Sequence, residues 1–275
     1  MKVVQPGAGL LASVLGRLRS DRTFIDNLKT FGGYDEIAAR KFETDANQGL
    51  IETVLFMMRG LTRRPFIDIS VTGTNEITAA LAEGAGAILW IADMIYIGNI
   101  SKIGLRNTGF DIHHLSRPDH GFSHSQFAMS VLNPVRIGYE MRYLSSRIVI
   151  HYEKPTKALR QIKSVLGKNG IVSIGSAIHG SNTELDIPFL GGITKLPSGA
   201  PRIAESNGTP ILPVFIRKGS GNNRFELIIE PALNRPISKT GATTEQLMEI
   251  YLQRLHPHVR SDPALWRGWA NLRAR

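Results

Sequence analysis

Apolar residues along the chain form short continuous runs separated by helically spaced stripes. The runs at 87–92, 171–174 and 211–216 are typical of strands that are covered on both faces of a parallel sheet. Further strands are predicted at 66–71, 110–115, 147–152 and 225–231. Helices are predicted at 75–83, 95–108, 133–145, 155–166, 198–207, 243–255 and 263–273. This alternation predicts an α/β fold with a largely parallel central sheet.

Residues 8–62 are predicted to be helical, ahead of the first strand. The first helix has an apolar face beside three arginines: Leu10, Leu11, Val14, Leu15 and Leu18 beside Arg17, Arg19 and Arg22. A basic amphipathic helix of this kind suits a membrane surface, and packing on the domain is an equal alternative. Gly32 and Gly33 mark a break, and helices follow at 35–42 and 50–58.

The stretch 171–217 is predicted to fold as strand, loop, small helix and strand. Gly191 and Gly192 in its loop let the backbone turn or approach a ligand closely. Ser198 is expected to cap the small helix. The Gly-Ser-Gly-Asn-Asn run at 219–223 predicts a hairpin between the last two strands, which would make the sheet mixed.

Composition narrows the class of partner. The 275 residues include 33 Lys and Arg against 23 Asp and Glu, a net charge of +10, which favours an acidic lipid surface, an acidic carrier protein or nucleic acid. Nucleic acid ranks last, because the basic residues are scattered and lack interleaved aromatics. The chain has no cysteine, and no run of about 18 apolar residues that would span a membrane. One cytoplasmic domain, 1–275, is the simplest organisation.

Three passages carry a resemblance to a known family. They are the PFLGG run with the following SGAP and PILPVF segments, the passage ISVTGTNEITAALAEGAGAILWIAD, and the closing HPHVRSDPALWRGWANLR. With LSRP in place of a YRP motif, their order resembles that of the lipid A late acyltransferases, within the lysophospholipid acyltransferase group, across 66–275. The resemblance implies a mixed sheet flanked by helices. It also implies acyl transfer from a carrier-protein or coenzyme A thioester to a lipid hydroxyl or amine, with no other cofactor, at the inner face of the inner membrane.

The chain departs from the family at the catalytic pair. The family has a histidine, four residues and then an Asp or Glu after the second strand, where the histidine deprotonates the acceptor. Asp93 and Gly98 stand at those positions here. Aspartate carboxylates, whose usual pKa is about 4, are weak bases toward an alcohol. The best replacement is His120 in the loop SRPDHGFSHS, since this loop follows a strand where α/β proteins bind ligands. The His120 ring is expected within hydrogen-bond reach of Asp93 or Asp119.

Several residues are candidates for binding the substrate. Arg117 matches the arginine of the family's RP pair, which implies contact with an anionic headgroup, and a loop salt bridge is the alternative. The other candidates flank the two loops: Ser116, Ser123, His179, Lys195, Ser198 and Arg202. Family members measure the acyl chain in an apolar tunnel, and the nearest apolar residues here, which are equally compatible with the core, are Trp90, Ile95, Tyr96, Phe122 and Phe127.

The remaining histidines are weaker candidates. Alternation points His113 and His114 to opposite faces of their strand, and His256 and His258 are expected at the surface. No histidine spacing typical of a zinc site and no phosphate-binding Gly-rich motif is present. Two alternatives to acyl transfer stay open: an aminoacyl-transferring relative, and a non-catalytic protein that binds lipid or a partner.

Overall fold

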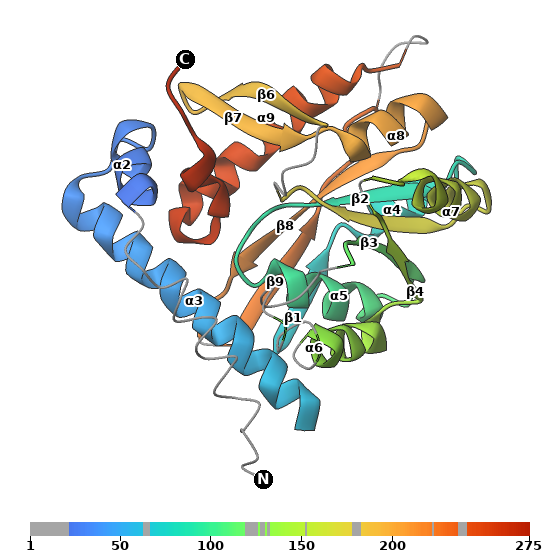
Figure 1. Cartoon of the computed structure of the whole chain (residues 1–275), viewed down its shortest axis with the longest axis horizontal. Coiled ribbons are helices and arrows are strands. Elements are labelled where there is room, and N and C mark those ends of the chain that lie inside the picture. The colour runs from blue at the N-terminus through green and yellow to red at the C-terminus, as the bar shows by residue number, and fades with distance from the viewer. Residues whose placement is uncertain are drawn as a thin grey trace.

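The computed structural model describes residues 22–62, 67–118, 126, 130, 133–151, 153–177, 183–221, 223–235 and 241–275. Seven strands of these residues form one central sheet with helices on both faces (Figure 1). From edge to edge the sheet contains β1 (Asp68–Thr72), β9 (Arg224–Ile229), β8 (Ile211–Lys218), β2 (Ala87–Ile91), β5 (Ile171–Gly175), β3 (Ile112–Ser116) and β4 (Ser146–Val149). The predicted α/β class with a mostly parallel sheet is therefore confirmed.

Strand direction divides the sheet into two parts. Strands β8, β2, β5, β3 and β4 are mutually parallel, whereas β9 is antiparallel to β8 and parallel to β1. The predicted hairpin around 219–223 joins β8 to β9. All five residues of β2 are buried, as expected for a central strand covered on both faces. The carboxyl ends of the five parallel strands consequently share one edge of the sheet.

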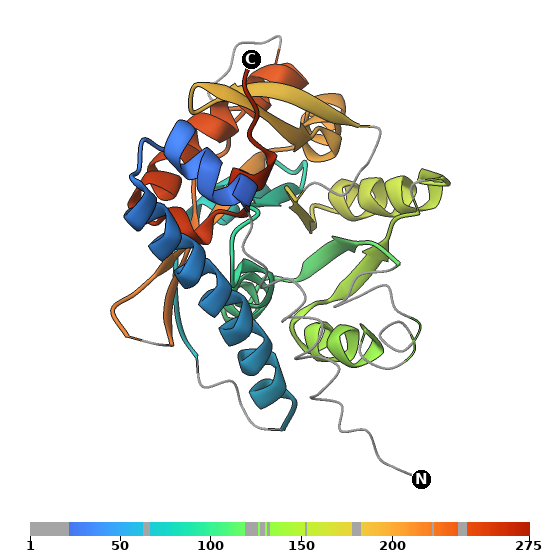
Figure 2. The same cartoon turned by 60° about the vertical axis from the view of Figure 1, so that its left-hand side comes forward.

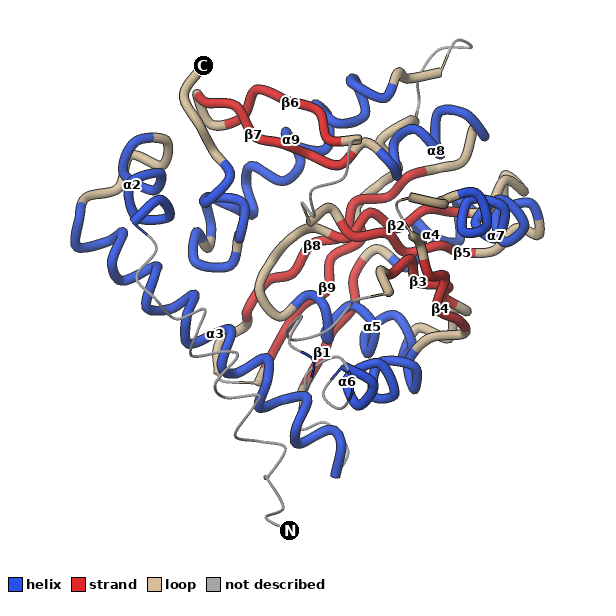
Figure 3. The backbone as a smooth tube through the Cα atoms, viewed as in Figure 1, coloured by secondary structure: helices blue, strands red, loops and turns tan. Residues whose placement is uncertain are grey.

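The connecting helices cover both faces of the sheet (Figure 3). Helices α5 (Ile97–Asn107) and α6 (Asn133–Glu140) cover one face, where a short 3₁₀ turn at Met141–Tyr143 follows α6. The other face carries α4 (Thr74–Leu81), α7 (Thr156–Gly167) and α8 (Gly199–Asn207). For α5, α6, α7 and α8, which lie between parallel strands, this division follows from right-handed crossovers, since parallel connections that step in opposite directions along a sheet lie on opposite faces. Helix α4 instead joins two antiparallel strands, β1 and β2.

The N-terminal helical region is described from residue 22 onward. Helix α2 (Arg22–Thr30) turns at Gly32 and Gly33 into α3 (Glu36–Thr62), a single helix of 27 residues where two helices were predicted. Its inner face contacts the sheet through Phe56, whose ring lies 5.9 Å from that of Phe225. The predicted amphipathic helix from Leu10 to Leu18 lies outside the described residues.

The C-terminal segment ties distant parts of the chain together (Figure 2). Helix α9 (Thr244–Ser261) is followed by two 3₁₀ turns, η3 (Pro263–Leu265) and η4 (Arg267–Asn271), in place of the predicted last helix. Trp266 forms a bridge with Met94, and Arg273 with Ile193. The Asn27 amide donates to the carbonyls of Trp269 (2.7 Å) and Leu272 (2.8 Å). This segment thus joins α2 to the carboxyl edge of the sheet.

The predicted loop around the PFLGG run is an antiparallel hairpin instead. Strands β6 (Glu184–Phe189) and β7 (Gly192–Pro197) are joined by Leu190 and Gly191, both with positive φ (51° and 83°). Two successive residues with positive φ form the tight turn that matches the twist of a hairpin. Gly191 therefore serves the turn. The side chain of Ser198 makes no capping hydrogen bond to α8, so that expectation was wrong.

None of the described helices combines the length and the apolar character that crossing a bilayer requires.

Candidate functional site

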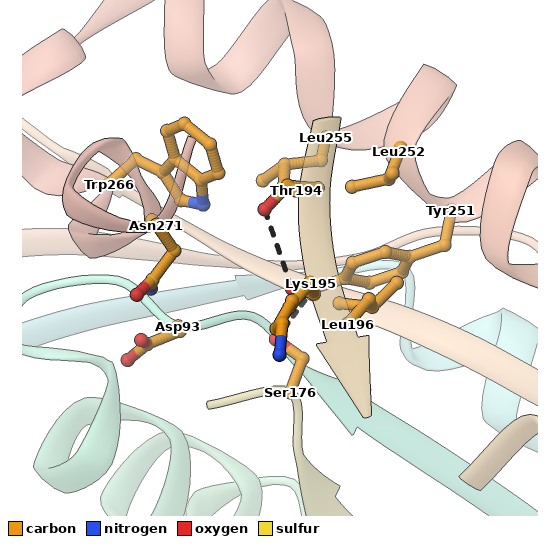
Figure 4. Close-up of a pocket in the computed structure, with 11 residues that line it drawn as sticks. Asp93, Ser176, Thr194, Lys195, Leu196, Tyr251, Leu252, Leu255, Trp266 and Asn271 are labelled. Atoms are coloured by element: carbon orange, nitrogen blue, oxygen red, sulfur yellow. Dashed lines mark hydrogen bonds between the residues drawn. The ribbon is translucent and has the colours of Figure 1, made fainter. Parts of the chain in front are cut away.

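A pocket opens at the carboxyl edge of the sheet, over the ends of β2 and β5 (Figure 4). Asp93 and Ser176 follow these two strands, while β7, α9 and η4 form the other walls. The empty space of the pocket, about 320 Å³, includes the open solvent at the mouth, so only a small part of it is enclosed by the protein. Its position is the one where parallel α/β sheets commonly bind ligands.

Asp93 is held at this edge by the C-terminal segment. Its carbonyl accepts a hydrogen bond from the Arg267 amide (3.1 Å), and its carboxylate lies 3.3 Å from the Arg267 guanidinium. The Asp93 side chain keeps 20 % of its surface exposed. The carboxylate is therefore oriented by an arginine and still accessible to a bound molecule.

Ser176 and Tyr251 form a second polar pair in the pocket. The Ser176 amide donates to the carbonyl of Ile91 (2.8 Å), which extends the β2–β5 pairing by one residue. Its hydroxyl lies 3.0 Å from that of Tyr251, and the Tyr251 ring packs 4.0 Å from that of Trp90. Burial, assisted by the charge of Asp93, raises the pKa of Tyr251 above its usual value of about 10. Tyr251 consequently stays protonated and able to donate a hydrogen bond.

Lys195 supplies the positive charge of the pocket. It lies on β7 opposite Asp186, and Asp186 pairs with Arg273. Figure 4 shows the Lys195 side chain extending into the opening that Asp93, Ser176 and Asn271 also line. Apolar side chains complete the walls: Leu196, Leu252, Leu255 and Trp266. The pocket can hold a polar group between a carboxylate and an ammonium, beside a short apolar surface.

The other described candidates lie away from this lining. Ser116 is buried and its hydroxyl donates to the carbonyl of Arg117 (3.4 Å). Arg117 is half-buried behind β3, two strands from β2, and its carbonyl accepts from Arg147. Ser198 is fully buried and its hydroxyl donates to the carbonyl of Thr183, while Arg202 is exposed on α8. Of the described candidates, the structure brings together only Asp93 and Lys195.

Four candidates fall outside the described residues, namely Asp119, His120, Ser123 and His179. The expected contact between His120 and Asp93 therefore stays a prediction. No histidine of the described residues lines the pocket.

Five residues were expected to form an acyl tunnel, and the three of them that the structure describes belong to the core. Trp90, Ile95 and Tyr96 are each at most 4 % exposed and do not line the pocket. Tyr96 instead donates its hydroxyl to Glu52 (2.6 Å) and thereby fixes α3 to the start of α5. Phe122 and Phe127 lie outside the described residues.

The structure places two histidines of β3 and one of α9 in contact with polar partners. His113 and His114 bond to serines of the two flanking strands, Ser146 at 2.7 Å and Ser173 at 2.8 Å. The expected surface position of His258 was wrong. Its ring is buried, stacks 4.2 Å from that of Phe215, and lies 3.0 Å from the carboxylate of Glu230.

Sequence reasoning missed Ser176, Tyr251 and Asn271. Ser176 directly follows a predicted strand, so the rule that drew attention to His120 applies equally to Ser176. Tyr251 lies on a predicted amphipathic helix, where an aromatic residue is indistinguishable from ordinary core. Asn271 reaches the pocket only because η4 folds back over β2, which no local pattern indicates.

Among the described residues, no three His, Asp or Glu side chains are gathered as a metal site would require. A scan against protein-family models gives no match, and a search of curated proteins gives no significant relative.

Proposed function

We propose that this protein is an acyltransferase that moves an acyl group from a thioester to a hydroxyl or amine of a lipid-type acceptor. The donor would be an acyl carrier protein or coenzyme A thioester, and no further cofactor is needed. The proposal combines the ordered sequence resemblance over 66–275 with the pocket at the carboxyl edge of the sheet. In this proposal the thioester of the donor and the hydroxyl or amine of the acceptor react in the pocket.

One observation carries the proposal. Asp93 stands where the resemblance expects the catalytic base, and this residue lines a pocket although nothing in its local sequence requires that. The same pocket contains Lys195, which was singled out because it flanks the PFLGG run. Two candidates from different passages of the resemblance, 102 positions apart, thus line one opening (195 − 93).

The pocket suits the charges that develop during acyl transfer. Attack on a thioester makes the carbonyl oxygen negative, and preorganised donors stabilise that oxygen. Tyr251, whose pKa is raised by burial, and Lys195 can supply such donors. Asp93 can accept a hydrogen bond from the attacking hydroxyl or amine, with Arg267 at 3.3 Å fixing its orientation. Removal of the proton from a hydroxyl would fall to His120 in this proposal.

The test measures transfer from acyl carrier protein and coenzyme A thioesters to a panel of lipid hydroxyls and amines. Asp93→Asn should lower turnover on the order of 100-fold. The matched control is Asp68→Asn, which removes another Asp–Arg pair of similar length, 3.4 Å to Arg224, at the far edge of the sheet. Equal rates for the two variants would contradict the proposed role of the pocket.

Transfer of an aminoacyl group is a second candidate, favoured by the charge of the pocket. The Asp93 carboxylate lines the pocket, and a carboxylate readily pairs with an α-ammonium group. Donors that differ only by an α-amino group distinguish the two candidates. If Asp93→Asn impairs the aminoacyl donor alone, the second candidate is supported.

We also propose attachment to the inner face of the inner membrane. The net charge of +10 favours anionic lipids. Exposed apolar side chains include Ile51 and Leu55 on α3 and Val135 on α6, two helices that pack together. Binding to anionic vesicles should weaken as salt rises, because charges are screened beyond about 10 Å at 0.1 M. Vesicle binding that is unchanged after Leu55→Ser and deletion of 1–22 would contradict this attachment.

A further inference from the structure

Helix α7 and the residues that flank it expose a basic surface, which the exposed Glu153 borders at its start. From residue 154 to residue 183 the sequence contains five cations and no carboxylate. The cations are Lys154, Lys157, Arg160, Lys163 and Lys168, and all five are exposed. The buried side of the helix is apolar and is formed by Ala158, Ile162 and Leu166. We call the five cations the α7 basic face.

The α7 basic face lacks the carboxylate partners that many other cations of the described chain have. Arg217, Arg224 and Lys29, for example, each pair with a carboxylate at 2.6–3.4 Å. None of the five α7 cations forms an ion pair with a carboxylate of the described residues. Like charges placed side by side repel one another, so this arrangement is unfavourable in the isolated protein.

Helix stability does not explain these cations. The first turn of α7 contains Lys157 and no acidic residue. The positive end of the helix dipole favours Asp or Glu at this position and disfavours lysine. The N-terminal half of α7 is therefore more positive than its own sequence charges indicate, and it attracts anions.

The α7 basic face begins at the edge of the sheet that holds the pocket. Strand β4 runs parallel to β3 and ends at the carboxyl edge, and α7 starts there before returning to the amino end of β5. Helix α7 packs on β4 and β5, and β5 leads directly to Ser176 in the pocket. Lys154 and Lys157 therefore lie near the carboxyl edge of the sheet at the end of β4, two strands along from β5, which leads to Ser176 (Figure 1).

The chemistry of α7 fits an acidic protein better than a membrane or RNA. Membrane-binding helices expose several large apolar side chains, whereas only Leu159 is exposed among the large apolar residues of α7. The other exposed apolar groups on α3 and α6 lie across the sheet from α7 (Figure 3). RNA binding without stacked aromatics is weakly supported, and α7 has no aromatic residue.

We infer that the α7 basic face is the docking surface for an acidic protein that delivers the thioester to the pocket. This inference rests on the proposed acyl transfer for the identity of the cargo. The recognition itself depends only on carboxylates of the partner facing the α7 cations, with Leu159 in contact between them. Such complementarity speeds association and fixes orientation.

The test measures binding of purified acyl carrier protein, an acidic probe, to the full chain by titration calorimetry at several salt concentrations. The variant Lys157→Glu, Arg160→Glu, Lys163→Glu should bind at least about tenfold more weakly and with a smaller salt dependence. The matched control reverses three exposed cations elsewhere: Arg22→Glu, Lys41→Glu, Arg275→Glu. Thermal melting of both variants verifies that each is folded. Of the three changes, Lys157→Glu places an acidic residue in the first turn of α7, where the helix dipole favours it.

The outcomes separate this inference from the proposed activity. Loss of binding in the α7 variant alone supports the docking surface, even if no acyl transfer is found. Equal binding by both variants, or no binding by the wild type, overturns the docking surface while transfer from coenzyme A thioesters can still stand. If the α7 variant loses binding to phosphatidylglycerol vesicles or RNA and keeps binding to the carrier protein, the surface serves a different partner and the inference is wrong.

Discussion

Two carboxylates in this protein pair with cations in surroundings that differ in solvent exposure. Glu140 lies between Lys102 (3.3 Å) and Arg136 (2.9 Å) on the α5–α6 face, where Lys102 and Glu140 are each only 5 % exposed. Asp93 lies 3.3 Å from Arg267 at the carboxyl edge, with 20 % and 49 % exposed. The chemistry of the two groups is the same, and their access to solvent differs.

This difference separates structural charge from functional charge. Burial lowers the pKa of Lys102, although the nearby Glu140 opposes that shift. Glu140, Lys102 and Arg136 form what we call the Glu140 cluster. If one of the buried charges of this cluster is removed, water cannot solvate the charge that remains. Asp93 retains solvent on one side, so its pair with Arg267 contributes little to folding. We expect changes at the first site to affect stability and changes at the second to affect ligand chemistry.

The largest effect is expected at the Glu140 cluster. Glu140→Gln removes the carboxylate and leaves Lys102 buried without a counter-charge, which should lower the free energy of unfolding by about 3–5 kcal/mol. Urea denaturation monitored by circular dichroism measures the change. Adding Lys102→Met should recover part of the loss, because the uncompensated charge is then removed. A loss below about 1 kcal/mol for Glu140→Gln would remove the contrast between the two sites.

The second-largest effect is expected on turnover, when Asp93 in the pocket is changed. Asp93→Asn should lower acyl or aminoacyl transfer on the order of 100-fold, and change the free energy of unfolding by no more than about 1 kcal/mol. Turnover and urea denaturation are measured on the same preparation. A large loss of stability would show that Asp93 belongs with Glu140 as a structural charge.

Much of the fold could be predicted from local pattern, whereas the site could not. The apolar runs of β2, β5 and β8 identify buried strands because covering both faces leaves no polar position. The β6–β7 hairpin was missed because Leu190 with positive φ has no signal in sequence. The pocket joins strand ends to η4, and such contacts depend on tertiary packing. The burial of His258 depends likewise on Phe215 and Glu230, which are far away in sequence.

The third effect concerns pH. The raised pKa of Tyr251 means that the folded protein keeps this proton above pH 10, where an unfolded tyrosine releases it. Stability is therefore complete below about pH 10 and falls as pH rises further, by up to about 1.4 kcal/mol per pH unit for one group. Tyr251→Phe should flatten this decline. Denaturation at pH 8 and pH 11 measures it, and an identical decline in the variant would contradict the assignment.

The smallest effect is expected at Lys195. Lys195→Ala removes an exposed ammonium from the pocket and should raise the KM for an anionic donor by about threefold to tenfold, with unchanged stability. Lys195→Arg keeps the charge and serves as the control. Kinetics at low and high salt measure the effect. A fall in kcat with unchanged KM would instead assign Lys195 to the transition state.

The bonds from Asn27 to Trp269 and Leu272 have a consequence for biosynthesis. They span 242 and 245 positions, so α2 cannot dock until the segment through residue 272 has left the ribosome. Because proteins are made from the N-terminus at roughly 5–20 residues per second, α2 waits for tens of seconds without its final partner. The wall of the pocket formed by η4 is completed only in that same event. A nascent chain therefore holds no finished pocket until residue 272 is free to fold.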